Sequence, residues 1–207
     1  MTGSLPSSEV NPSEKVFLLS PANLSGARAK QLLSPRASFE AATLYRSPDG
    51  VAIDQAFSFM SALYFRGKIA YARRFAWAPE LEDSAVYIIA PGFGLVPPDW
   101  RIDRVRMRTL RRTAVDLASR AYRRPLEAAA GALYARLAPS THVVLLGSVA
   151  TGKYVDVLRP ILGDRLLFPR SFAGLGDMSR GSLMLRAAAS GEELAYATLD
   201  APRHRSS

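Results

Sequence analysis

The chain has 207 residues, a net charge of +9, no cysteine and two histidines. Without cysteine it can form no disulfide, iron–sulfur cluster or thiolate zinc site. With only His142 and His204, neither a His-rich metal site nor a Ser–His–Asp triad is expected. We therefore expect no metal or cofactor, and the residue types left for chemistry are carboxylates, Lys, Tyr, Ser, Thr and main-chain groups.

No apolar run reaches the roughly 18 residues that span a bilayer, so no membrane partner is expected. The first 14 residues have neither the basic start nor the apolar stretch of a signal peptide. We expect residues 1–14 and 200–207 to be disordered tails, residues 15–199 to form a single domain, and the protein to be cytoplasmic. With 48% hydrophobic residues, such a domain can bury a full core.

Short apolar runs alternate with helical patterns along the chain. Strands are predicted over Lys15–Leu19, Val86–Ala90, Val143–Leu146, Arg165–Phe168 and Glu193–Leu199. Helices are predicted over Leu24–Leu33, Ala37–Arg46, two parts of Ile53–Ala76, the segment after Arg101, Leu126–Leu137, the segment after Tyr154, and a segment ending at Ala189. Continuously apolar strands alternating with helices indicate an α/β fold, a single domain with a largely parallel sheet and helices on both faces.

The segment Ile53–Ala76 is rich in aromatic residues. Aromatic side chains at helical spacing are typical of a hydrophobic core, and this is the favoured interpretation. Gly67 is predicted to divide the segment into two helices, because glycine weakens a helix interior.

The positive charge is concentrated in one segment. Residues 101–124 contain nine arginines against Asp103 and Asp116, a local net charge of +7 that leaves +2 for the rest of the chain. We predict one helix through this segment, with an inward-facing apolar set: Val105, Leu110, Ala114, Leu117 and Ala121. A neighbouring face carries four arginines at three- and four-residue spacing: Arg104, Arg108, Arg111 and Arg112. Such a surface favours nucleic acid, mainly DNA, as a partner. The alternative is a solvated helix face.

The stretch His142–Leu162 predicts a buried strand, a small polar turn and a helix. Loop amides and a helix N-terminus converge in such a unit, which suits an anion. The turn also spells Gly-x-x-x-x-Gly-Lys from Gly147 to Lys153, with Tyr154 where a phosphate-binding loop has Ser or Thr. A phenol is too long to hold magnesium at that position. A nucleotide-binding enzyme and a plain strand-to-helix turn therefore both stay open.

Ligands of open parallel sheets bind beyond the carboxyl ends of the strands. The loops after the predicted strands, together with a late glycine-rich loop, should meet there and form a pocket for a small anionic or base-like ligand. The candidate ligand-binding residues are Ser20, Asn23, Gly92, Gly94, Gly147, Ser148, Thr151, Lys153, Tyr154, Asp177, Ser179 and Arg180. They form no recognisable catalytic set, so no catalytic residue is assigned.

Taken in order, four segments resemble those of the peroxide-stress protein YaaA family. The four are an early Leu-Leu-Ser-Pro-Ala at Leu18–Ala22, an Ile-Ala-Pro-Gly-Phe-Gly-Leu-Val-Pro at Ile89–Pro97, a strand-to-helix turn at Ser148–Tyr154, and a Met-Ser-Arg at Met178–Arg180. A related group of small bacterial and phage domains shares the Leu44–Tyr45 pair and the Gly94–Asp99 segment. One departure is Lys153, which stands where the family has an acidic residue.

The resemblance implies DNA binding and a role in oxidative stress or DNA damage, with the chemistry open. It also implies that the Gly147–Lys153 turn is the strand-to-helix turn of that family. Besides a YaaA-like protein, two hypotheses remain: a nucleotide-binding enzyme that uses this turn, and an interaction domain without enzymatic activity.

Overall fold

The computed structural model describes residues 12–198, and its centre is a six-stranded sheet of order β4-β3-β1-β6-β7-β8. Its strands are β1 (Lys15–Leu19), β3 (Val86–Ala90), β4 (Gly94–Val96), β6 (His142–Leu146), β7 (Leu166–Pro169) and β8 (Tyr196–Thr198). The four central strands run parallel, whereas β4 and β8 are antiparallel edges. A second, two-stranded sheet pairs β2 (Val51–Ala52) with β5 (Arg101–Ile102). The predicted α/β class is confirmed.

Each predicted strand is present in the structure, within a few residues at either end. The short strands β2, β4 and β5 were not predicted, because two or three residues carry no readable alternation. Residues 1–11 and 199–207 lie outside the described range, and with them most of the first predicted tail, all of the second and His204. Glu14, predicted to lie in the first tail, accepts a hydrogen bond from the His142 N–H through its carbonyl.

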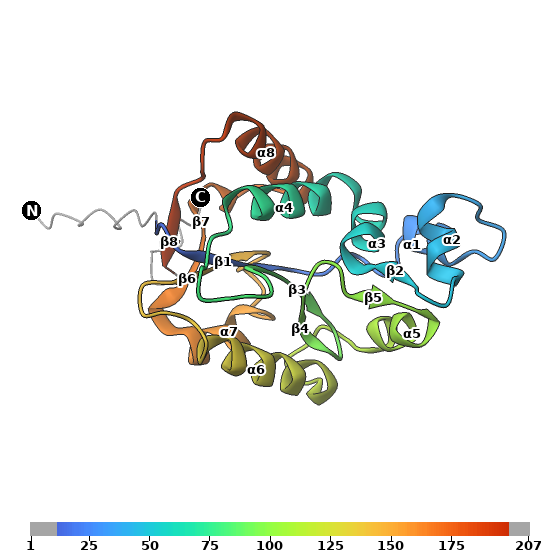
Figure 1. Cartoon of the computed structure of the whole chain (residues 1–207), viewed down its shortest axis with the longest axis horizontal. Helices are drawn as coiled ribbons and strands as arrows, with labels where there is room; N and C mark the ends of the chain where they lie inside the picture. The colour runs from blue at the N-terminus through green and yellow to red at the C-terminus, as the bar shows by residue number, and fades with distance from the viewer. Residues whose placement is uncertain (1–11, 199–207) are drawn as a thin grey trace, which may run out of the picture.

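Helices cover both faces of the sheet (Figure 1). They are α1 (Ala27–Leu33), α2 (Glu40–Arg46), α3 (Ile53–Met60), α4 (Ala62–Phe75), α5 (Arg104–Arg112), α6 (Arg120–Tyr134), α7 (Val155–Leu162) and α8 (Asp177–Ser190), with 3-10 turns η1 (Gly163–Arg165) and η2 (Arg170–Phe172). Helices α4 and α8 lie over one face, α6 and α7 over the other. A hydrophobic core lies on each face of the sheet. Successive side chains of β1 point to opposite faces, so Phe17 and Leu19 belong to the core under α4 and α8, and Val16 and Leu18 belong to the core under α6 and α7.

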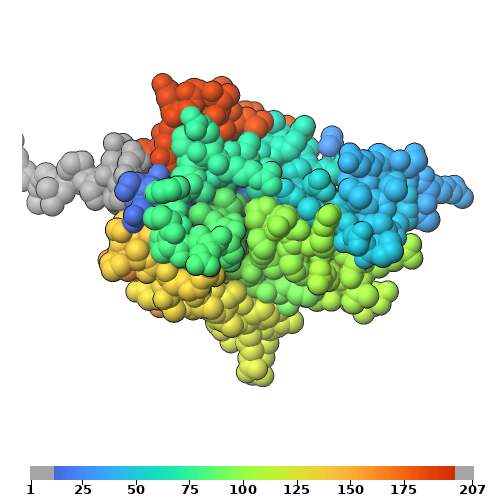
Figure 2. Space-filling model, viewed as in Figure 1, coloured from blue at the N-terminus to red at the C-terminus, as the bar shows by residue number. Residues whose placement is uncertain are grey.

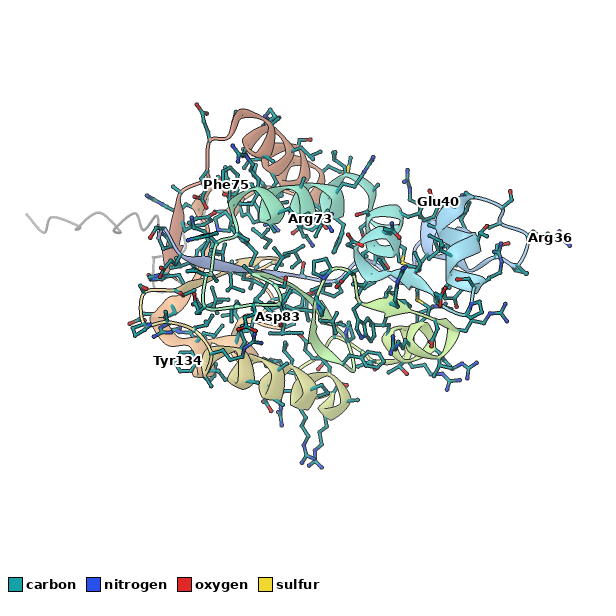
Figure 3. The ribbon with its side chains drawn as sticks, viewed as in Figure 1. Arg36, Glu40, Arg73, Phe75, Asp83 and Tyr134 are labelled. Carbon is teal, nitrogen blue, oxygen red and sulfur yellow. The ribbon has the colours of Figure 1, made fainter. Side chains whose placement is uncertain are left out.

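Helices α1, α2, α3 and α5 gather beyond one end of the sheet (Figure 1). In the space-filling view the blue α1–α2 region and the yellow-green α5 region lie next to each other at that end of the molecule (Figure 2). Arg73 lies on α4 (Figure 3). It donates to Asp54 on α3 at 2.6 Å, which links α3 to a helix that covers the sheet. This end of the molecule is where the parallel strands finish.

The prediction that Gly67 divides the aromatic segment is wrong. The break falls at Ser61 and Ala62, where Ala62 has a φ of 41°, and α4 continues unbroken through Gly67. Gly67 serves packing instead, because a Cβ there would lie 2.5 Å from the Gly181 carbonyl oxygen on α8. A Cβ on Gly181 would in turn lie 2.8 Å from the Leu63 carbonyl oxygen. The two glycines let the backbones of α4 and α8 touch.

The prediction of a single helix through the basic segment 101–124 is also wrong. Helix α5 ends at Arg112 and α6 begins at Arg120, with a turn in which the Asp116 carboxylate accepts the Ala118 N–H. Of the predicted inward-facing set, Leu110 is buried and Leu117 packs, partly buried, against the core under α6 and α7, whereas the other three members are exposed. Val105 is 66% exposed, and Ala114 and Ala121 are exposed as well. The residues of the segment that are buried are Ile102, Met107, Leu110 and Tyr122.

The contact between α4 and α8 yields a stability prediction. Gly67→Ala should lower the free energy of unfolding by about 1–3 kcal/mol, because its methyl group overlaps the Gly181 backbone, which cannot rotate away. Gly131→Ala on α6 is the matched control, since nothing lies within 4 Å of its added Cβ. That control should be neutral or stabilising by up to about 1 kcal/mol. Urea titration of both variants measures the difference, and equal stabilities would contradict the proposed close contact.

Candidate functional site

The chain order in the sheet creates a switch point beside β1. From β1 the chain passes to β3 on one side and later to β6 on the other, so two adjacent parallel strands, β1 and β6, have connections that leave in opposite directions. Ser20 follows β1 and Gly147 follows β6, and the Ser20 N–H donates to the Leu146 carbonyl at 3.2 Å. A Cβ on Gly147 would lie 3.0 Å from the Ser20 Cβ. This is the position at which α/β sheets bind ligands.

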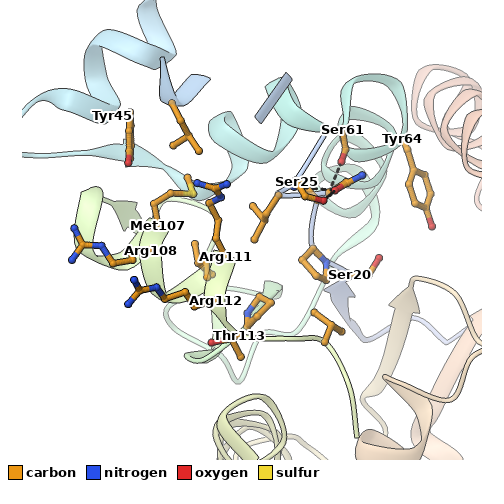
Figure 4. A pocket seen from close by; sticks show the side chains of 18 of the residues that line it. Ser20, Ser25, Tyr45, Ser61, Tyr64, Met107, Arg108, Arg111, Arg112 and Thr113 are labelled. Atoms are coloured by element: carbon orange, nitrogen blue, oxygen red, sulfur yellow. Dashed lines mark hydrogen bonds between the residues drawn. The ribbon is translucent and has the colours of Figure 1, made fainter. Parts of the chain in front are cut away.

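A cavity of about 1100 Å³ opens at these strand ends. The strand-end residues that line it include Ser20, Pro21, Asn23, Pro91, Ser148, Lys153 and Tyr154, and the α5 residues include Arg104, Met107, Arg108, Arg111 and Arg112. In the close-up, Arg108 and Arg112 lie on one side and Ser20 and Tyr64 on the other (Figure 4). The cavity therefore joins the two groups of predicted residues, the arginine face and the strand-end loops.

Local packing places α5 at the rim of the cavity. Asp103 caps the helix by accepting the Arg106 N–H at 2.7 Å, and Met107 and Leu110 anchor the inner side of the helix. Gly92, in the turn after β3, has a φ of 89°, and a Cβ there would lie 2.9 Å from the Thr109 and Thr113 side chains. The last turn of α5 thus rests directly on the backbone of the β3–β4 turn.

The four arginines that were predicted to contact nucleic acid are exposed. Within residues 12–198 the structure gives no hydrogen bond or ion pair for any of Arg104, Arg108, Arg111 and Arg112. Two neighbours differ, because Arg106 donates to the Arg101 carbonyl at 2.6 Å and stacks over Trp100, while Arg101 donates to the Gly50 carbonyl. Guanidinium groups that lack an internal partner can form paired hydrogen bonds with phosphate or carboxylate.

The opposite side of the cavity contains a buried amine that the sequence analysis missed. Lys68 on α4 is 1% exposed, and its Nζ lies 2.7 Å from Ser20 Oγ and 3.0 Å from the Ser20 carbonyl oxygen. The same Nζ lies 3.9 Å from the centre of the Tyr64 ring. One signal was available in the sequence: Lys68 falls in the apolar stripe of its helix, three residues after Phe65 and four before Ala72. A lysine at such a position needs a buried partner.

Burial lowers the pKa of the Lys68 ammonium from 10.5 to about 7. Asp177 on α8 opposes this shift, whereas Arg180 on α8 and Lys153 in the strand-to-helix turn reinforce it. A substantial fraction of Lys68 is therefore neutral near pH 7. A neutral amine has one lone pair, so it can accept the Ser20 hydroxyl proton while it donates to the Ser20 carbonyl.

Two phenols complete this side of the site. Tyr64 and Tyr154 both line the cavity, and Tyr154 is 4% exposed. Burial raises the pKa of both phenols, and a hydrogen bond with Ser20 opposes that rise without cancelling it. Both groups are therefore protonated at neutral pH, and each can donate a hydrogen bond to a ligand oxygen.

The structure divides the predicted ligand residues into two groups. Ser20, Asn23, Ser148, Lys153, Tyr154 and Asp177 line the cavity, and Gly147 backs Ser20. Thr151 and Ser179 are exposed and do not line it.

Three further predicted ligand residues have packing roles and do not line the cavity. Gly92 allows α5 to pack against the β3–β4 turn, and Gly94 allows α6 to pack against β4. A Cβ on Gly94 would lie 2.4 Å from the Pro125 carbonyl oxygen. Arg180 donates to the Phe172 carbonyl at 2.9 Å and lies 3.9 Å from Asp177. The Met-Ser-Arg segment lies in the first turn of α8.

The turn from Gly147 to Lys153 is not arranged to bind an anion. Gly152 has a φ of 71°, and the Asp156 carboxylate packs against it, 2.4 Å from the position of an added Cβ. An acidic group thus already occupies the N-terminal end of α7, and it would repel a phosphate. The Lys153 carbonyl accepts the Tyr122 hydroxyl at 2.8 Å. These contacts favour a structural strand-to-helix turn over a phosphate-binding loop for a nucleoside triphosphate.

Comparison with protein-family models, with curated proteins and with solved structures gave no match. Among residues 12–198, no helix combines the length and the apolar character needed to cross a bilayer. The same residues contain no group of three or more metal-ligating side chains that could hold a metal ion. The candidate site is therefore defined by its own geometry alone.

The buried amine makes stability depend on pH. Lys68 titrates near 10.5 when unfolded and near 7 when folded, so between these values the unfolded chain binds the extra proton and stability rises with pH. From pH 7.5 to 9.5, the free energy of unfolding of the wild type should rise relative to Lys68→Met by up to about 1.4 kcal/mol per pH unit. Urea titrations at three pH values measure this. Lys30 is exposed, so the free energy of unfolding of Lys30→Met should change with pH as that of the wild type does. If Lys68→Met also shows the pH dependence of the wild type, the Lys68 amine keeps its ordinary pKa.

Proposed function

We propose that the protein binds nucleic acid and holds one nucleotide unit of the strand in the strand-end cavity. The phosphates contact Arg104, Arg108, Arg111 and Arg112, and the base or sugar reaches toward Ser20. One observation carries the proposal: the four unpaired arginines of α5 and the strand-end loops line the same cavity. An anionic ligand with a neutral, polar remainder matches the two sides of that cavity.

Size and charge support this choice. About 1100 Å³ accommodates a nucleotide, because sites for small organic ligands usually fall between roughly 300 and 1000 Å³. The segment 101–124 carries a net +7, and clustered Arg favours a polyphosphate over a singly charged metabolite. The Tyr45 phenol, which lines the cavity beside the arginines, offers a further hydrogen-bonding group.

The proposal includes the YaaA-like role in oxidative stress or DNA damage that the sequence segments imply. It is consistent with the placement of two of those segments, since Ser20–Ala22 and the Ser148–Tyr154 region both contribute to the cavity wall. DNA is the preferred partner.

Binding should be mainly electrostatic. Arginines that contact about three or four phosphates on duplex DNA release counterions, which gives a log–log slope of affinity against salt of roughly −3. Arg108→Ala with Arg111→Ala should reduce the magnitude of this slope by up to about two and weaken all sequences alike. Fluorescence anisotropy titrations of a random duplex and of a single strand, over a range of salt concentrations, measure both quantities.

The matched control is Arg120→Ala with Arg124→Ala. It removes the same two charges from the same basic segment, but these side chains are exposed on α6 and do not line the cavity. We expect its slope to stay close to that of the wild type. If both double variants lose binding equally, the site is a diffuse basic surface and the cavity is not involved. No binding at low salt would refute the proposed function.

A further inference from the structure

The contact between Ser20 and Lys68 has features that a purely structural lysine does not need. Ser20 lies on the cavity wall, and Lys68 lies behind it, 1% exposed and outside the cavity lining. The Nζ–Oγ distance of 2.7 Å is that of a direct hydrogen bond. No carboxylate among residues 12–198 forms an ion pair with Lys68. Ser20, a 5% exposed residue of the cavity wall, is therefore backed by an amine that has no ion-pair partner among residues 12–198.

We propose that Ser20 is the nucleophile of an acyl-transfer reaction and that Lys68 is the base that removes its proton. An activated nucleophile requires a base within about 2.6–3.2 Å, and this pair meets that requirement. A serine paired with a lysine is a known variant of the serine nucleophile with its base. The close approach of Gly67 to Gly181 holds α4, and Lys68 with it, directly against α8.

The reaction balances with the ester and water alone. Ser20 Oγ attacks the carbonyl carbon of an ester while its proton passes to the Lys68 amine. The bond to the alcohol then breaks, and the leaving alkoxide takes a proton from a water molecule in the cavity, because Ser20 separates Lys68 from the cavity. The hydroxide formed in that step attacks the acyl group on Ser20, and the Lys68 ammonium returns its proton to Ser20 Oγ as the carboxylic acid is released.

The two phenols are suitably placed to stabilise the charge that develops on the carbonyl oxygen. Tyr64 and Tyr154 line the same cavity as Ser20. Both are protonated at neutral pH because burial raises the pKa of each. Hydrogen-bond donors that are already in position can stabilise such an oxyanion.

The substrate class follows from the two sides of the cavity, and this step rests on the proposed function. The acyl carbonyl would lie at Ser20, and a phosphate on the same molecule would lie at Arg108 and Arg112, on the other side (Figure 4). The structure thus assigns a carboxylic ester of a phosphate-bearing alcohol, such as an acylated nucleotide. An imine with Lys68 itself is less consistent with the geometry, since Ser20 stands between the amine and the cavity.

A neutral fluorophosphonate probe tests the nucleophile directly. When Ser20 Oγ attacks, a P–O bond forms, fluoride leaves and hydrogen fluoride is released, so the intact mass rises by one phosphonyl group. We expect one adduct on the full-length protein, mapped to Ser20 by peptide mass spectrometry. Ser20→Ala should abolish it, and Lys68→Met should slow it by at least about 100-fold with an unchanged circular dichroism spectrum. The matched controls are Lys30→Met and Ser25→Ala; Ser25 lines the same cavity, but its hydroxyl already donates to Asn23.

The rate of labelling as a function of pH gives a second measurement on the unaltered chain. The charged and titratable groups that face Lys68 are Tyr64 on its own helix, Asp177 and Arg180 on α8, and Lys153 in the strand-to-helix turn. The rate should rise between about pH 6 and 8 and then level off, as the Lys68 amine becomes neutral. A rate that climbs steadily to pH 10, as for an unactivated hydroxyl, overturns the proposal even if Lys68→Met fails to fold.

The probe carries no phosphate and needs no arginine, so this inference and the proposed function can fail separately. Labelling of Ser20 without salt-dependent nucleic acid binding would overturn the proposed function and leave the nucleophile. Nucleic acid binding without an adduct on Ser20, or with an adduct only on other serines, would overturn the nucleophile.

Discussion

The burial of strand β1 on both faces is the constraint on which the rest of the structure depends. All five residues from Lys15 to Leu19 are buried, because helices cover each face of a parallel sheet. Polar groups can then face a ligand only where the strands end. Ser20 is the first residue beyond β1, and it lies beside Gly147 at the point where the connections leave in opposite directions. The position of the candidate site is therefore a consequence of the way in which the sheet is buried.

The cavity combines two electrostatic environments. On α5 the guanidinium groups are exposed and form no hydrogen bond or ion pair within residues 12–198, so they are available to an anion. Around Lys68 the surroundings are apolar and aromatic, and the amine loses part of its charge because it is desolvated. A ligand that spans the cavity would thus have its anionic part at the arginines and its uncharged part at Ser20.

Glycines fix the distances between these parts. Gly67 and Gly181 bring α4 against α8, which keeps Lys68 at the end of β1, and Gly92 brings the last turn of α5 against the β3–β4 turn. Gly67 was expected to break a helix, and Gly92 was expected to bind a ligand. Both instead permit two segments of the chain to pack closely. Replacing any of them with a larger residue would move the walls of the cavity relative to each other.

The sequence by itself determined the α/β class, five of the six strands of the central sheet and the arginine face of α5, because these depend on local periodicity and charge. It also indicated that the loops after β1 and β6 meet, since the carboxyl ends of parallel strands share one edge. Only the tertiary structure decided where the basic segment breaks, which loop residues reach the cavity, and that Lys68 lies against Ser20. These three depend on contacts between residues far apart in the chain: Lys68 and Ser20 are 48 positions apart. No local pattern encodes which buried hydroxyl a buried amine will meet, because packing of the whole helix against the sheet selects it.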